Sequence, residues 1–154
     1  MSTSSQTGAV GTTVTRAHFA DRLMSKIREK GTPICVGIDP VYERLPAAVR
    51  GDSADRGHIN AEGSIEAIYR FVRGVLETVA PHVPCVKIQA ACFERYHWPG
   101  AEAYYRLVEE AEELGLLVIA DAKRGDIGIS VEHYAAGCLA SSRFTDLGHL
   151  KGPD

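Results

Sequence analysis

Charged side chains follow directly on an apolar run in the stretch VIADAKRGDIG, residues 118–128. Within it, Asp121, Lys123 and Asp126 are spaced as D-x-K-x-x-D. An acidic neighbour favours the charged form of a lysine, so an aspartate beside Lys123 would keep that ammonium available as a proton donor near neutral pH. On its own, such a pattern is more often a structural ion-pair network. The chemistry therefore depends on what neighbouring strands bring to the same place.

Two other apolar runs also carry a charge. PICVGID ends in Asp39, and VPCVKIQ contains Lys87. Side chains alternate across a strand, so Asp121 and Lys123 share one side if their strand extends that far. A lone lysine in a buried strand is costly, and nearby carboxylates offset that cost. We therefore expect Asp39, Lys87, Asp121 and Lys123 to meet at one rim, where parallel strands end.

The elements that must position these charges are readable from apolar spacing. The predicted helices cover residues 18–30, 64–80 and 100–114, with one more running from Ser130 to residue 140. The predicted strands cover residues 33–39, 83–89 and 116–121. A stretch rich in proline and glycine, residues 39–63, is predicted to be one long connection.

Small residues mark the predicted ends of these elements. Gly31 and Gly115 are expected to end the first and third helices, since glycine often follows a helix. Ser64 and Ser130 are predicted N-caps.

The stretch VIADAKRGDIG also contains two glycines and an arginine, for which we expect other roles. Gly125 and Gly128 are expected to adopt positive φ and let the backbone sit close to a ligand. Arg124 is expected to be solvent-exposed.

Strands that alternate with helices predict parallel βαβ units, hence the α/β class. An open doubly wound sheet and part of a (β/α)8 TIM barrel both fit, and both place function at the carboxyl ends of the strands. Residues 1–16 are predicted to be a disordered Ser/Thr/Gly-rich tail. Residues 17–142 are predicted to form the folded unit, and residues 143–154 an irregular tail.

Composition narrows the class of protein. With 154 residues, 45% hydrophobic and 24% charged, the chain suits one globular domain. A net charge of −3 gives no sign of nucleic-acid or membrane partners. Four cysteines without paired spacing favour reduced thiols in the cytoplasm. A zinc site is not indicated, because the spacing of His82, Cys85, Cys92 and His97 matches no compact zinc motif.

The motifs VGIDP, VKIQAACFERYHWPG and VIADAKRGDIGIS resemble the orotidine 5′-phosphate decarboxylase family, in the wording of its longer bacterial branch. The resemblance runs from about residue 19 to residue 140. It implies a (β/α)8 barrel and conversion of orotidine 5′-phosphate to UMP and CO2 in pyrimidine synthesis. It implies no cofactor.

The resemblance also implies a role for each charge of the rim. Asp39 would bind the ribose hydroxyls of the substrate, and Lys87 would bridge the ribose and Asp121. Asp121 would lie beside the substrate carboxylate. Lys123 would donate a proton to C6 of the pyrimidine once CO2 has left.

A second group of residues is implied to serve the site of a partner subunit. Asp126 would enter that site accompanied by Ile127 and Ser130, so the active enzyme would be a homodimer.

Two alternatives remain open at this point. A related branch decarboxylates 3-keto-gulonate phosphate with Mg²⁺, but it carries a metal-binding glutamate where this chain has Lys87. A barrel needs about 250 residues, so the three predicted strands suggest an incomplete barrel with little or no activity by itself. The chain would then be an amino-terminal part of the enzyme, or a non-catalytic remnant that associates through its open sheet edge.

Overall fold

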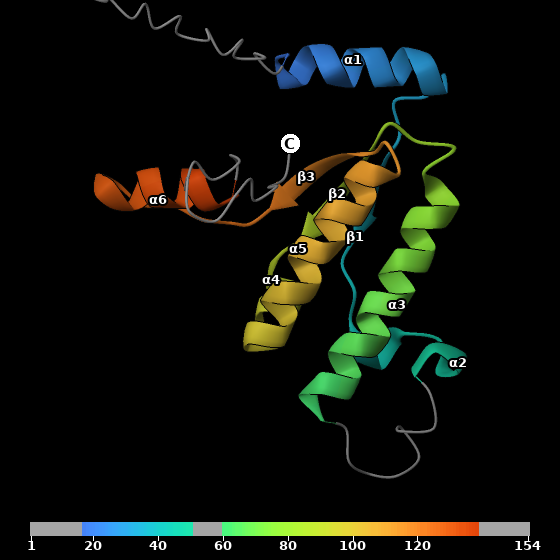
Figure 1. Ribbon diagram of the computed structural model, residues 1–154, viewed down its shortest axis with the longest axis vertical. Coiled ribbons are helices and arrows are strands. Elements are labelled where there is room, and N and C mark those ends of the chain that lie inside the picture. Colours follow the sequence, from blue (N-terminus) through green and yellow to red (C-terminus); the bar gives the residue numbers. More distant parts are fainter. Residues whose placement is uncertain (1–16, 51–59, 139–154) are drawn as a thin grey trace, which may run out of the picture.

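The computed structural model describes residues 17–50 and 60–138 (Figure 1). The predicted tails, residues 1–16 and 143–154, lie outside the described residues. The strands are β1 (Cys35–Ile38), β2 (Cys85–Gln89) and β3 (Leu117–Asp121). The helices are α1 (Phe19–Lys30), the 3-10 turn η1 (Tyr42–Arg44), α2 (Ala47–Arg50), α3 (Ala61–Val79), α4 (Ala91–Glu94), α5 (His97–Glu113) and α6 (Ile129–Cys138).

The described residues form a parallel sheet of three strands in which β2 lies between β1 and β3. In the register of the sheet, Lys87 is opposite Gly37 and Ile119, and Gln89 is opposite Asp121. All three strands therefore end at the same edge. The predicted βαβ arrangement is confirmed.

Helices α3 and α5 cover one face of the sheet (Figure 1). Val86, Ile88 and Val118 point into this layer and have no exposed surface. The helices meet them with apolar side chains that are equally buried: Ile68, Val72 and Leu76 of α3, and Leu107, Val108 and Ala111 of α5. Burying each larger side chain contributes about 1.5–3 kcal/mol, so alternation along β2 fixes which face carries Lys87.

The predicted start of α3 at Ser64 is wrong. The helix begins three residues earlier, and its N-cap is Asn60, whose Oδ1 accepts a hydrogen bond from the backbone N of Gly63 at 2.7 Å. Ser64 is buried, and its hydroxyl donates to the carbonyl of Asn60 at 3.0 Å. A buried serine satisfies its hydroxyl on the preceding turn, so it is not available to cap.

The helix predicted from residue 100 begins at His97, and α4 was not predicted. Pro99 is in the first turn of α5, where its missing N–H removes no intrahelical bond. The Trp-Pro-Gly sequence therefore lies within the first turn of the helix. At the other end, Gly115 has φ of 79°, and Gly31 after α1 has φ of 69°, so both predicted stops are confirmed.

The predicted long connection contains structure of its own. Tyr42 of η1 and Leu45 are buried in the main core. Helix α6 begins at Ile129, so Ser130 lies within its first turn and is not the residue before it. Two other expectations for the loop change: Gly128 has a positive φ of 62°, but the second positive φ is that of Lys123 at 47°, and Gly125 has none.

Candidate functional site at the carboxyl ends of the strands

Asp39, Lys87, Asp121 and Lys123 meet at one edge of the sheet, and we call them the charged rim. Lys87 is its centre, because its Nζ donates to both carboxylate oxygens of Asp39 at 2.8 and 2.9 Å. The same Nζ lies 3.5 Å from Oδ2 of Asp121. The hydrogen bond with Asp39 is the main cause that raises the pKa of Lys87, against the opposing effect of desolvation. Lys87 is therefore a fixed ammonium held between two acids.

Asp121 is the carboxylate on which the other donors converge. Its Oδ1 accepts a hydrogen bond from Nζ of Lys123, and its Oδ2 accepts one from Nε2 of Gln89 at 2.9 Å. The pKa of Asp121 is lowered, chiefly by the hydrogen bond with Lys123 and further by the charge of Lys87, while desolvation opposes both. Asp121 is consequently ionised at neutral pH.

Lys123 lies outside the strand, because β3 ends at Asp121 and the predicted extension is absent. Its positive φ of 47° turns the chain so that its side chain still reaches back to Asp121. Residues with a Cβ rarely adopt this conformation. The side chain of Lys123 is 65% exposed, so its ammonium is paired with an acid and is open to a ligand at the same time.

The charged rim has two ammonium groups and two carboxylates, and therefore no net formal charge. It can bind hydroxyl groups through Asp39, and it can present an ammonium at a position where negative charge develops on a substrate. Fixed charges of this kind stabilise a transition state without having to reorganise.

The other predicted site residues are not brought to the rim. Asp126 is exposed, and its Oδ1 accepts from the backbone N of Ile127 at 2.8 Å. Ile127 is 86% exposed, and Ser130 lies on α6. Within residues 17–50 and 60–138, no hydrogen bond or ion pair is found between these three residues and the charged rim.

The sequence did not predict the contacts that Gln89, Arg124 and Glu94 make near the charged rim. Gln89 shares the face of Lys87, and that parity was its only signal. Arg124 is exposed as expected, but it also forms an ion pair with Glu94, which was not predicted. No local pattern could have indicated that pair, since its members are 30 positions apart.

No group of three or more His, Cys, Asp or Glu side chains in the described part of the chain is arranged to hold a metal ion. The four cysteines are free thiols. No described helix combines the length and apolar character that a membrane span requires.

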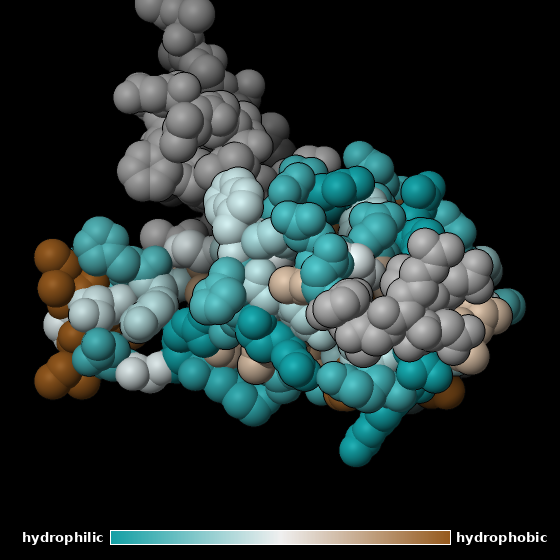
Figure 2. Space-filling model, turned by 90° about the horizontal axis from the view of Figure 1, so that it is seen from below, coloured by the Kyte–Doolittle hydropathy of each residue, from teal (hydrophilic) through white to brown (hydrophobic). Residues whose placement is uncertain are grey.

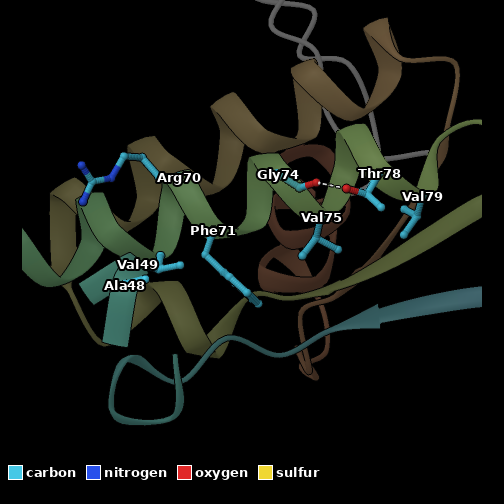
Figure 3. Close-up of a pocket in the computed structure, with 8 residues that line it drawn as sticks. All are labelled: Ala48, Val49, Arg70, Phe71, Gly74, Val75, Thr78 and Val79. Carbon is cyan, nitrogen blue, oxygen red and sulfur yellow. Dashed lines mark hydrogen bonds between the residues drawn. The ribbon is translucent and has the colours of Figure 1, made fainter. Parts of the chain in front are cut away.

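A hollow of about 750 Å³ lies away from the rim, between α2 and α3 (Figure 3). Val49, Phe71, Val75 and Val79 make its lining mostly apolar, and Thr78 donates to the carbonyl of Gly74 at 2.7 Å. Arg70 is the one ionisable residue of the lining. The hollow therefore has no group of acids and bases comparable with the charged rim.

Known proteins are similar in sequence to the part of the chain that carries the sheet and the charged rim. A Rhodopirellula baltica protein named orotidine 5′-phosphate decarboxylase is 37% identical over 125 residues, which are 80% of this chain and 40% of that protein. A Streptomyces coelicolor protein of the same name is 37% identical over 121 residues, 79% of this chain and 39% of its own length. The chain thus spans about 40% of the length of these curated relatives.

Solved structures agree on the architecture. A Streptomyces avermitilis crystal structure described as an orotidine 5′-phosphate decarboxylase superposes with a TM-score of 0.64 at 33% identity, over 85% of this chain and 42% of that one. The Leishmania donovani OMP decarboxylase gives 0.56 at 24% identity, over 77% and 38% of the two chains, which supports the fold alone. The predicted fold class, an incomplete (β/α)8 barrel, is confirmed. The model of the orotidine 5′-phosphate decarboxylase / HUMPS family matches residues 32–147, and the chain belongs to that family.

Proposed function

We propose that this chain supplies the charged rim of an enzyme that decarboxylates orotidine 5′-phosphate to UMP. The observation that carries the proposal is the alternating row of Asp39, Lys87, Asp121 and Lys123, held by direct contacts at the carboxyl ends of three parallel strands. Active sites of parallel α/β folds form at this end of the sheet. The proposed reaction, decarboxylation, is taken from the family to which the chain belongs.

The reaction suits these residue types without a cofactor. When the bond from C6 to the carboxylate breaks, its electron pair stays on C6 and CO2 leaves. The ammonium of Lys123 stabilises that developing negative charge and then transfers a proton to C6, which leaves a neutral amine and UMP. Asp121 is the group that holds this ammonium in place before the reaction, and it would lie beside the departing carboxylate.

The other half of the rim suits binding of the sugar. One face of the Asp39 carboxylate is bound by Lys87, and the side chain of Asp39 is 51% exposed, so hydroxyl groups can still reach it. Lys87 would then connect the bound ribose to Asp121.

The active form in this proposal is a homodimer in the cytoplasm. Asp126, Ile127 and Ser130 would contribute to the site of a second subunit, and their position away from the charged rim is compatible with that role. Support comes from the apolar side chains on and before α6, where Ile127 and Ile129 are 86% and 71% exposed. Figure 2 shows apolar surface gathered at the end of the molecule where α6 lies.

The test is a chimaera in which residues 17–138 replace the corresponding segment of the Rhodopirellula baltica relative. Residues 17–138 by themselves are expected to show little or no activity, because they contribute three strands, whereas the phosphate of such barrels is usually held by loops after strands 7 and 8, and that binding energy drives the reacting centre. The chimaera supplies those loops. It should consume orotidine 5′-phosphate, and Lys123→Ala should lower kcat by about 10²–10⁴-fold, the usual contribution of general acid catalysis.

Lys26→Ala, on α1, is the matched control and should leave the rate of the chimaera unchanged. A chimaera that is folded by circular dichroism but inactive would count against the proposed function. Activity that survives Lys123→Ala would remove Lys123 as the proton donor.

A further inference from the structure

Arg124 joins the loop after β3 to two helices. Its guanidinium forms a hydrogen-bonded ion pair with Glu94 at the end of α4. Nη1 of the same group donates to the backbone carbonyl of Ala122 at 2.6 Å. Its central carbon lies 5.7 Å from the ring centre of Tyr134 on α6, which is within range for a cation–π contact. One planar side chain thus binds α4, its own loop and α6.

The half-buried side chain of Ala122 packs against the core, but packing beneath this loop is incomplete. A cavity of about 150 Å³ lies under it, lined by Phe93, Tyr104, Ala122 and Arg124 together with neighbouring residues of α4, α5 and α6. Side chains beside a void lose the contacts that hold them elsewhere in a protein interior. The polar contacts of Arg124 therefore add a restraint on the carbonyl of Ala122 to the contacts of its side chain with the core.

The hydrogen bond from Arg124 restrains the peptide unit that joins Ala122 to Lys123. The carbonyl of Ala122 belongs to the peptide unit that continues into the nitrogen of Lys123, and a peptide unit is planar. Fixing that carbonyl fixes the plane from which Lys123 turns into its positive φ of 47°. A residue with a Cβ holds such a conformation only where its surroundings enforce it.

We infer that Arg124 is a positioning residue, which holds Lys123 against Asp121 by binding Glu94 and the carbonyl of Ala122 at once. A lysine at this position would keep the charge but would lack the planar fork that makes both bonds. The consequence for catalysis rests on the proposed function. The consequence for the geometry of Lys123 does not.

The direct experiment measures how readily each lysine of the purified chain reacts with acetic anhydride at limiting concentration, with mass spectrometry of the peptides. In Arg124→Met, labelling of Lys123 relative to Lys26 should rise by about two- to fivefold, the range that corresponds to the coupling of exposed ion pairs. Lys26 is a suitable reference because it lies beside Gly115, at the opposite end of β3 from Asp121.

Two further variants separate positioning from charge and from general stability. Arg124→Lys should label like Arg124→Met, and labelling at the wild-type rate would overturn the proposed fork. Arg95→Met is the matched control, since Arg95 follows α4 and its nearest carboxylate is that of Glu43 at 4.0 Å. It should leave Lys123 labelling unchanged. If Arg124→Met lowers the thermal midpoint but leaves Lys123 labelling unchanged, the role is structural only and the inference fails.

The catalytic consequence is tested in the chimaera described above. Arg124→Met should lower kcat by about tenfold with KM within twofold, because an interaction with the reacting centre is disturbed while the groups that bind the sugar remain. A tenfold rise in KM with kcat unchanged would contradict the positioning role. A wild-type chimaera without activity would refute the proposed function and leave the labelling result as an independent test.

Discussion

Lys87 binds both carboxylate oxygens of Asp39, with its Nζ 2.8 and 2.9 Å from them, across 48 positions of sequence. This contact connects the end of β1 to the interior of β2. The same ammonium also lies 3.5 Å from Asp121, so one positive charge acts on both carboxylates. Several consequences of this row of charges can be measured without an assay of catalysis.

The pKa of Asp121 should respond to its two ammonium partners in a definite order. The hydrogen bond with Lys123 is the larger cause of its lowering, and the charge of Lys87 is a smaller one. We expect Lys123→Met to raise the pKa of Asp121 more than Lys87→Met does. Titration followed by carboxyl ¹³C NMR measures both shifts, and the reverse order would show that Lys87 is the principal partner.

The pH dependence of stability should reveal the same carboxylate. The folded pKa of Asp121 lies below its ordinary value of 3.8, so its contribution is fully present above that pH and is lost as pH falls through the folded pKa. Wild type should therefore be more stable than Asp121→Asn at pH 6, by a difference that stays constant down to about pH 4.5 and shrinks only below 3.8.

Urea unfolding of both proteins at several pH values measures this difference. A gap that closes between pH 6 and 4.5 would mean that the pKa is raised, and would contradict the geometry of the rim.

Gly100 should tolerate no side chain. A Cβ at this position would lie 1.9 Å from the backbone carbonyl oxygen of Phe93, which cannot move aside as a flexible side chain can. Gly100→Ala should therefore destabilise the protein by about 3 kcal/mol, the upper range for overpacking. Its matched control is Gly74→Ala in α3, where a Cβ meets nothing within 4 Å. That change should stabilise by about 0.5–1 kcal/mol, as for an exposed helix position. Equal effects in urea unfolding would refute the close approach of α4 and α5.

The cysteines should differ in reactivity even where they are neighbours. Cys35 and Cys85 face each other in the register of β1 and β2, but Cys35 is exposed and Cys85 is buried. Burial, with the Cys35 thiol as a further cause, raises the pKa of Cys85 to about 12. At pH 8, iodoacetamide should therefore label Cys35 first and leave Cys85 unmodified until the protein unfolds. Rapid labelling of Cys85 in the folded chain would show that the edge between β1 and β2 opens.

Local patterns in the sequence were enough to place Asp39, Lys87 and Asp121 at the rim. Lys123 reaches the rim through its positive φ and not through the strand extension that was expected. Alternation along β2 requires Val86 and Ile88 to face the helices, and it therefore places Lys87 and Gln89 on the opposite side. Residues 31 and 115 could be predicted as helix ends because glycine reaches positive φ at little cost. The three strand motifs also predicted the family, since they combine residue identity with order.

Only the tertiary structure decided how these groups are held. Asn60 caps α3 because the fold buries Ser64, and no local spacing distinguishes the two. Gln89 reaches Asp121 because β2 and β3 pair in one register, and Arg124 reaches Glu94 because the fold brings the loop after β3 next to α4. Such contacts depend on the distances that packing brings about between residues far apart in the chain, whereas the patterns of sequence report only the conformation of neighbours.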